Sequence, residues 1–355
     1  MAHNEQLRVP VARKKAAMTM DKTTWGLRGP VKNVQILTAQ FEEQDGQITE
    51  KPSFGYTITF NKQGQVVEQV NRNPNGSDWR TVNDYSDSGN LLMTRLFDSK
   101  GALNSEVRYI YDANDRLTAE QHVDRNGNVT TPVTYAYDDA GRKVRLNELD
   151  SPGEADMMIG IEGVTLVSAP EARWVESRYD DRDQVVEVKV FNIDGAIVTR
   201  IEITRDAQGN SLEETQYIGD AFPFRACGSD SCSTEEMAEL TEEQKAELAR
   251  VFSPGSAMSK HTHRYDTEGR LIESKLMMMG MEVNRQTFAY DEAGNKSEEV
   301  SYNANEMSGT RAIFTREYDK HGNWTMELVS TASSWDSEFG LSTPAQVTRR
   351  LITYW

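Results

Sequence analysis

One short pattern recurs along the chain and constrains its fold more than any other feature. The pattern is an aromatic residue, then Asp or Asn, two free positions, and Gly. Strict copies occur at Phe60–Gly64, Phe97–Gly101, Tyr137–Gly141, Phe191–Gly195, Tyr265–Gly269, Tyr290–Gly294 and Tyr318–Gly322. Looser copies at 85–89, 111–115, 124–127, 179–183 and 206–209 fill the gaps. Recurrence at this density indicates a repeat architecture.

Each copy has the chemistry of a hairpin turn. The aromatic residue ends a strand, the Asp or Asn side chain accepts backbone N–H groups, and Gly supplies a positive φ. Asp also tolerates the left-handed region, which explains Asp115 and Asp183 where Gly is expected. The pattern predicts structural turn roles for Asp98, Gly101, Asp138, Gly141, Asp266, Gly269, Asp291, Gly294, Asp319 and Gly322.

The spacing of the turns predicts the fold class. Adjacent turns lie about 12–14 residues apart in the denser stretches, which leaves room for one strand and one turn. We therefore predict an all-β fold: a long antiparallel meander of hairpins that forms a curled or open sheet, with one helical insertion.

The repeat resembles the YD repeat of the Rhs family. The copies that carry the resemblance are Tyr265–Leu271, which reads YDTEGRL, and Tyr290–Asn295, which reads YDEAGN. The match covers roughly residues 55–220 and 259–330. It implies a curling β-sheet, usually exported or at the cell surface, that wraps into a shell around a toxin or binds carbohydrate. About a dozen turns are too few for a large shell, and no toxin-like C-terminal domain is recognisable.

Breaks in the repeat suggest the domain organisation. We predict a flexible leader at 1–24 and a single YD-repeat domain at 25–355, with insertions at 151–172 and 220–258. The second insertion is predicted to be helical, because two capping-box patterns begin at Ser233 and Thr241 and apolar residues recur on one face.

Charge and hydropathy exclude two classes of partner. The net charge of −17 over 355 residues disfavours nucleic acid, because an acidic surface repels a polyphosphate. No run of about 18 apolar residues is present, so membrane insertion through a helix is not expected.

Two cysteines, Cys227 and Cys232, are separated by four residues that include Gly and Ser. A disulfide is the favoured interpretation, consistent with an oxidising compartment, and two reduced thiols are the alternative. His261 and His263 alternate on a predicted strand and so share a face. With the cysteines they could form a zinc set, but the spacing matches no recognised pattern, and the prediction is no metal and no cofactor.

Trp79 and Trp335 lie in polar surroundings and are the candidate ligand-binding residues, since exposed indole rings stack on sugars. No P-loop, dinucleotide fingerprint or catalytic elbow occurs. The sequence thus predicts a binding or scaffold module with a carbohydrate or protein partner, more an interaction protein than an enzyme. The expected location is secreted or in the cell envelope, with the cytoplasm as the alternative. A glycan-acting hydrolase that uses an insertion as a lid, or an accessory protein of a toxin system, are the other hypotheses.

Overall fold

The structure is a computed structural model that describes residues 21–44, 47–72, 78–148, 160–161, 164–165, 173–222, 241, 253–303, 309–333 and 343–355. All regular secondary structure in these ranges is β. No helix among the described residues has the length and apolarity to cross a membrane. The predicted helix at 233–252 lies outside the described residues except for Thr241, so it stays a prediction.

The strands follow one another along the chain with short connections. The first eleven are β1 (Val31–Gln44), β2 (Gln47–Phe60), β3 (Val66–Arg72), β4 (Trp79–Tyr85), β5 (Leu91–Phe97), β6 (Leu103–Tyr111), β7 (Leu117–Asp124), β8 (Val129–Tyr137), β9 (Lys143–Glu148), β10 (Gly160–Ile161) and β11 (Val164–Thr165). The others are β12 (Trp174–Tyr179), β13 (Val185–Phe191), β14 (Ile197–Arg205), β15 (Ser211–Ile218), β16 (Ala257–Tyr265), β17 (Leu271–Met278), β18 (Met281–Tyr290), β19 (Lys296–Asn303), β20 (Gly309–Tyr318), β21 (Trp324–Ser333) and β22 (Thr343–Tyr354).

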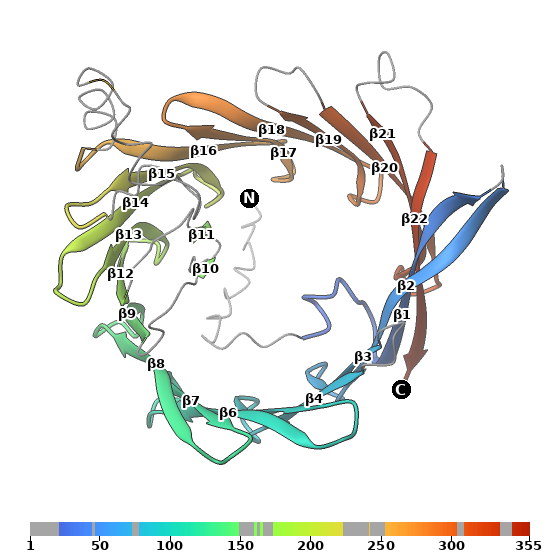
Figure 1. The fold of residues 1–355 in the computed structure, drawn as a ribbon, viewed down its shortest axis with the longest axis horizontal. Helices are drawn as coiled ribbons and strands as arrows, with labels where there is room; N and C mark the ends of the chain where they lie inside the picture. Colours follow the sequence, from blue (N-terminus) through green and yellow to red (C-terminus); the bar gives the residue numbers. More distant parts are fainter. Residues whose placement is uncertain are drawn as a thin grey trace, which may run out of the picture.

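Twenty of these strands close into one antiparallel ring (Figure 1). Each strand pairs with its neighbour in the chain, β9 pairs with β12, and β22 pairs back with β1. The short strands β10 and β11 form a separate pair. The predicted all-β meander is confirmed, and the sheet is closed rather than open. Closure matters physically because it leaves this sheet without a free edge that could pair with another chain.

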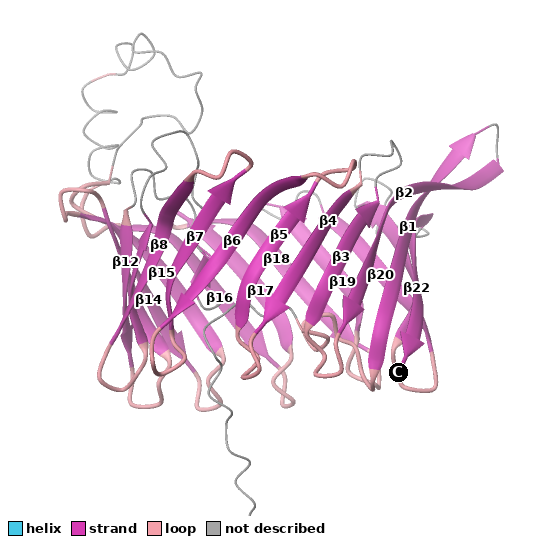
Figure 2. Cartoon of the chain, turned by 90° about the horizontal axis from the view of Figure 1, so that it is seen from below, coloured by secondary structure: helices cyan, strands magenta, loops and turns pink. Residues whose placement is uncertain are grey.

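The two ends of the ring are built differently. Because consecutive hairpins turn at alternate ends, the nine hairpins that follow β2, β4, β6, β8, β12, β14, β16, β18 and β20 lie at one end. Every one of them has a copy of the repeat turn, and we call this the repeat end; it lies at the bottom of Figure 2, where the chain ends. The connections that contain both predicted insertions join strands at the opposite, insertion end.

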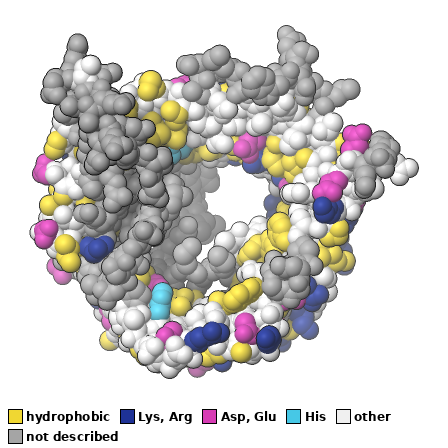
Figure 3. Space-filling view, in the orientation of Figure 1, with side chains coloured by type: hydrophobic (Ala, Val, Ile, Leu, Met, Phe, Trp, Pro, Cys, Tyr) yellow, Lys and Arg dark blue, Asp and Glu magenta, His cyan; other side chains and the backbone are white. Residues whose placement is uncertain are grey.

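One face of the sheet is identified as the inner wall by residues 21–30, which run inside the ring beside β1–β3 (Figure 1). Leu27 packs into a buried cluster with Val34 and Ile58. Trp25 contacts Tyr56, with ring centroids 5.4 Å apart. These strand residues therefore face the interior, where a central opening is visible in Figure 3.

Cross-strand pairs extend this assignment around the ring, since residues directly opposite each other share a face. Starting from Ile36, the inner face passes through the pairs Ile36–Arg350, Thr348–Glu327, Arg316–Glu327, Ala312–Glu299, Phe288–Glu299, Gln286–Ser274 and His263–Ser274. In the other direction, Ile36 pairs with Tyr56, Tyr56 with Asn71, and Asn71 with Trp79. Asn71 and Trp79 therefore also lie on the inner face. The outer face has ladders of ion pairs, for example Arg80–Glu68, Arg95–Asp84 and Lys260–Glu213.

Candidate functional site on the inner wall

Copies of the repeat turn occur at both ends of the ring and share one hydrogen-bond pattern, which Asp98 illustrates. Its Oδ1 accepts the backbone N–H groups of Lys100 and Ala102, both at 2.9 Å. The N–H of Asp98 donates to the carbonyl of Ala102, and that of Gly101 donates to the carbonyl of Asp98. Gly101 has φ +80°, as the predicted turn requires. A short polar side chain thus satisfies the backbone of a tight turn.

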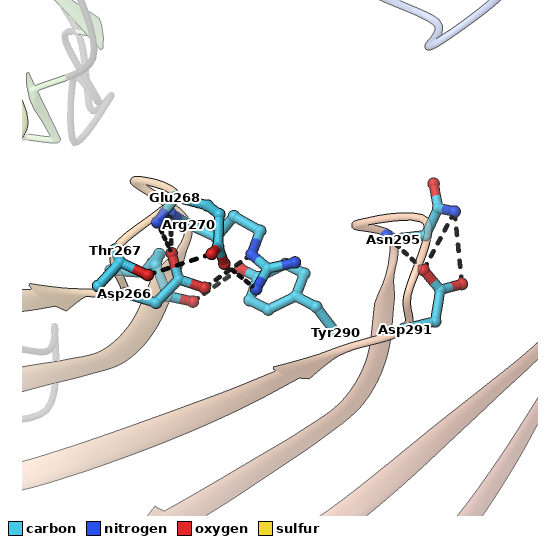
Figure 4. A network of polar contacts seen from close by, with 8 residues as sticks. Asp266, Thr267, Glu268, Arg270, Tyr290, Asp291 and Asn295 are labelled. Atoms are coloured by element: carbon cyan, nitrogen blue, oxygen red, sulfur yellow. Dashed lines mark hydrogen bonds and ion pairs between the residues drawn. The ribbon is translucent and has the colours of Figure 1, made fainter.

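At the repeat end, neighbouring turns are linked through an Asp–Arg–Tyr unit (Figure 4). The Nε of Arg270 donates to Asp266 at 2.7 Å, and the guanidinium lies 4.9 Å from the ring centroid of Tyr290 in the next repeat turn. The hydroxyl of Tyr290 donates to the carbonyl of Leu271 at 2.7 Å. The same arrangement recurs at Arg116–Tyr137 and Arg142–Tyr179. These contacts link neighbouring repeat turns into a continuous rim at this end of the ring.

Three side chains with metal-binding chemistry meet on the inner wall between β15 and β16. Glu214 is directly opposite His261, and His263 lies two residues further along β16 on the same face. One ligand atom from each residue lies within 4.8 Å of the other two. Burial lowers the pKa of His263 and outweighs the opposing effect of Glu214, so the imidazole is held neutral.

A second polar cluster lies on the inner wall at β7 and β8. The hydroxyl of Tyr135 donates to Glu120 at 2.6 Å, and the Nε2 of His122 lies 4.0 Å from the other carboxylate oxygen. Burial, followed by the bond to Glu120, raises the pKa of Tyr135, which keeps the phenol protonated. The cluster can donate and accept hydrogen bonds to a polar ligand in the interior.

A third feature is a cation on the inner wall of β22. The guanidinium of Arg350 stacks on Trp324, 3.4 Å from its ring centroid. Its Nε and Nη1 are buried and have no hydrogen-bond partner among the described residues. Burial lowers the pKa of Arg350 to about 10. Arg316 nearby is paired with Glu327 at 2.6 Å, whereas these two donors of Arg350 are left unsatisfied.

The sequence-predicted ligand residues are placed only in part. Trp79 lies at the start of β4 on the inner face and is 37% exposed. Trp335, Cys227 and Cys232 lie outside the described residues, so their roles stay predictions. His261 and His263 share a face, as the alternation on their strand predicts.

Sequence reasoning missed Glu214, Glu120 and Arg350 as members of these clusters. Their partners lie on neighbouring strands, and the strand register that brings them together leaves no local signal. Glu214 has one weak signal in the sequence. It lies on the strand before the second insertion, and the two histidines lie on the strand after it, so the two strands could be neighbours.

A family model described as the RHS repeat matches residues 111–148, which span the turns after β6 and β8. This part of the chain matches the RHS repeat. This confirms, over these residues, the resemblance that the sequence predicts. The comparison with curated protein sequences found no match.

Solved structures similar to this RHS-repeat chain include a TcdB2-TccC3-Cdc42 complex, at 13% identity and a TM-score of 0.32, over 90% of this chain and 17% of that one. A porin-like protein from Bacteroides uniformis is 10% identical with a TM-score of 0.30, over 92% of this chain and 98% of that one. The chain spans less than a fifth of the first of these structures. Similarities at this level identify neither a function nor a partner.

Proposed function

We propose that this RHS-repeat ring is a non-enzymatic scaffold that binds a protein partner against its inner wall. The observation that carries the proposal is that the wall already binds a stretch of polypeptide, residues 21–30 of the same chain. The N–H of Lys22 donates to the carbonyl of Gly64 at 2.9 Å, and Asp21 forms a β-bridge with Gln65, both in the turn between β2 and β3 where the wall meets the repeat end. Leu27 is buried to 3% exposure in the same place.

These contacts are of the type that proteins use to bind extended peptides. Backbone hydrogen bonds supply affinity for any sequence, and apolar pockets select particular side chains. The unpartnered donors of Arg350 lie on the same wall, beside Trp324, and suit an acidic side chain or a backbone carbonyl of the partner. A polypeptide with apolar and acidic residues fits this chemistry.

Carbohydrate is the second candidate, favoured by Trp79. Its indole ring is 37% exposed on the inner face. The register places the polar residues Asn71 and Thr81 on that face beside it. An exposed ring flanked by hydrogen-bonding groups is the arrangement that binds a sugar.

Peptide and glycan arrays probed with the full chain separate the two candidates. Binders are then measured with paired variants at adjacent positions on opposite faces. Ala312→Trp narrows the interior, whereas Ile313→Trp changes the outer face. A peptide that binds inside should lose at least about tenfold in affinity with Ala312→Trp and keep its affinity with Ile313→Trp. Equal affinity in both variants would contradict binding in the interior.

The glycan arm uses Trp79→Ala with Arg80→Ala as its control, because Arg80 lies on the outer face and pairs with Glu68. Loss of glycan binding in Trp79→Ala alone supports the second candidate. Turnover of a bound glycan would instead favour the hydrolase hypothesis.

Export or attachment to the cell envelope is part of the proposal. Its support is the RHS repeat together with the ion-paired outer face, which suits aqueous surroundings. Fractionation of the producing cells with an antibody against the chain tests it, and recovery in the cytoplasm alone would contradict it. Neighbouring genes that encode a toxin would favour the accessory-protein hypothesis.

A further inference from the structure

We propose that Glu214, His261 and His263 form a binding site for a divalent transition metal of the zinc class on the inner wall of the ring. The inference goes beyond the scaffold function, because a scaffold needs no metal. The site lies between the paired strands β15 and β16. The connection between these two strands contains the second insertion.

The geometry supplies three donors from a rigid part of the sheet. Glu214 and His261 are directly paired across the two strands, and His263 follows at the next position on the same face. The donor atoms lie within 4.8 Å of one another. Donors around a tetrahedral zinc lie about 3.3 Å apart, so small side-chain rotations close the set without movement of the backbone.

The donor types match the metal. Imidazole nitrogen and carboxylate oxygen are ligands that zinc takes, and two histidines with one glutamate make a known three-ligand combination. Three protein ligands leave a fourth position open. Because the three side chains share the inner face, that position faces the interior of the ring, where water or a bound ligand would fill it.

Two further observations point to a missing ligand. The Nδ1 of His263 is buried and has no hydrogen-bond partner among the described residues. Buried polar atoms are nearly always satisfied, so an unsatisfied nitrogen in a ligand cluster calls for a partner. The hydroxyl of Ser211 donates to one oxygen of Glu214 at 2.8 Å. Hydrogen bonds of this kind orient the carboxylates that bind metals in proteins.

The surroundings also favour a cation. The described residues paired with the cluster or next to it on the inner face include Ile203, Gln216, Ser259, Ser274 and Leu276. All five are uncharged. Lys260 and Lys275 lie on the outer face, where they pair with Glu213 and with Glu273 and Glu282. Arg205, on the same strand as Ile203, donates to the carbonyls of Val185 and Gly209 and is not paired with the carboxylate of Glu214.

The test uses the full chain without a histidine tag, stripped of metal and titrated with zinc sulfate by calorimetry. We expect about one zinc per chain at this site. His261→Gln, His263→Gln and Glu214→Gln should each weaken zinc binding by about 100-fold or more. His122→Gln is the matched control, because His122 is also an inner-wall histidine beside a glutamate. Zinc binding that is absent, or is unchanged in all three variants, would overturn the proposal.

Cobalt substitution of the unaltered chain gives a second measurement that does not depend on the folding of any variant. The expected spectrum has the visible bands of a four- or five-coordinate site with nitrogen and oxygen ligands. A strong thiolate charge-transfer band would assign the metal to Cys227 and Cys232 instead and would overturn the assignment to Glu214, His261 and His263.

Discussion

The backbone N–H of Trp355 donates to the carbonyl of Pro30 over 3.0 Å, which reproduces the bond from Asp112 to Arg116 in an unbroken repeat turn. Tyr354 pairs with Val31 across a bulge, as Tyr111 pairs with Leu117, the first residue of its return strand. Residues 29–31 and 354–355 therefore form a tenth turn at the repeat end, assembled from two distant parts of the chain. The ring closes through its own repeat geometry.

We call the junction between residues 28–31 and 354–355 the seam of the ring. Asn323 of the neighbouring turn stabilises it. Its Oδ1 accepts the N–H of Arg28 at 2.6 Å, and its Nδ2 donates to the carbonyl of Arg28 at 3.0 Å and to the hydroxyl of Tyr354 at 2.8 Å. The side chain is 1% exposed. Asn323→Ala should lower the free energy of unfolding by about 2–4 kcal/mol, because two backbone groups lose their partner in a buried place.

Urea unfolding followed by circular dichroism measures this loss. The matched control is Asn295→Ala, because Asn295 has the same position in its turn but its side-chain amide, among the described residues, bonds only to Asp291, at 3.4 Å. The control should lose about 1 kcal/mol or less. Equal losses at the two positions would show that Asn323 contributes only to its own turn.

The turn aspartates should make the ring sensitive to acid. Hydrogen bonds from the Arg116 side chain lower the pKa of Asp112, those from Asn128 lower that of Asp124, and the backbone N–H of Arg142 lowers that of Asp138. A lowered folded pKa means that these carboxylates stabilise the fold above the unfolded value near 4. That contribution is lost as the pH falls through the folded values. The thermal midpoint should therefore drop between neutral pH and about pH 3.

A triple variant, Asp112→Asn, Asp124→Asn and Asp138→Asn, checks the cause. Asn already occupies this turn position at Asn61 and Asn192 and keeps the acceptor oxygen. The variant should have a smaller drop in thermal midpoint over the same pH range, since its three side chains do not titrate. An unchanged drop would place the acid sensitivity elsewhere in the protein.

The hairpins were predictable from the sequence, but the closure of the ring was not. A turn such as Tyr265–Gly269 is encoded within five residues, since the cap and the positive-φ residue are adjacent in sequence. The seam joins Arg28 to Asn323 across 295 positions. Whether a meander curls far enough to meet its first strand depends on twist accumulated over all the strands, which no single repeat unit encodes.

Substitutions at Gly101 measure the free-energy cost of the positive φ without a contribution from steric clashes of the added side chain. A Cβ at this position would meet no atom within 4 Å, yet φ is +80°. Gly101→Ala should lower the free energy of unfolding by about 1 kcal/mol through backbone strain alone, and Gly101→Asn by less, because Asn tolerates this region. Urea midpoints of the two variants measure the difference. A loss of stability in Gly101→Asn as large as that in Gly101→Ala would argue against a left-handed backbone conformation at this position.

The outer face should contain one ion-pair network that matters to stability. Glu187 lies 3.1 Å from Arg178, 3.8 Å from Lys189 and 3.6 Å from Arg200, and its side chain is 13% exposed. Glu187→Gln should lower the free energy of unfolding by about 1–3 kcal/mol, because three cations lose their shared anion.

The control is Glu202→Gln, because Glu202 also pairs with Arg200 but its side chain is 47% exposed. Exposed pairs of this kind contribute about 1 kcal/mol or less. Differential scanning fluorimetry ranks the two variants. A loss in Glu202→Gln as large as in Glu187→Gln would contradict the role of Glu187 as the centre of the network.

The inner-wall clusters show a similar division between what the sequence indicates and what it leaves out. Alternation on one strand indicates that His261 and His263 share a face. The position of Glu214 beside them depends on the register between β15 and β16, which is set after a connection of nearly 40 residues. The polar surroundings of Trp79 indicate a contact residue, but its inward orientation follows only from the pairing of β3 with β4.

The pairing of β22 with β1 has a consequence for how such a ring can change in size. An antiparallel meander that closes on itself must contain an even number of strands, because an odd number would leave two neighbours parallel at the seam. The circumference can therefore grow or shrink only by whole hairpins. Duplication or loss of one strand-turn-strand unit would give a wider or narrower ring with the same seam, so the diameter of the interior is available to evolution, and to design, in discrete steps.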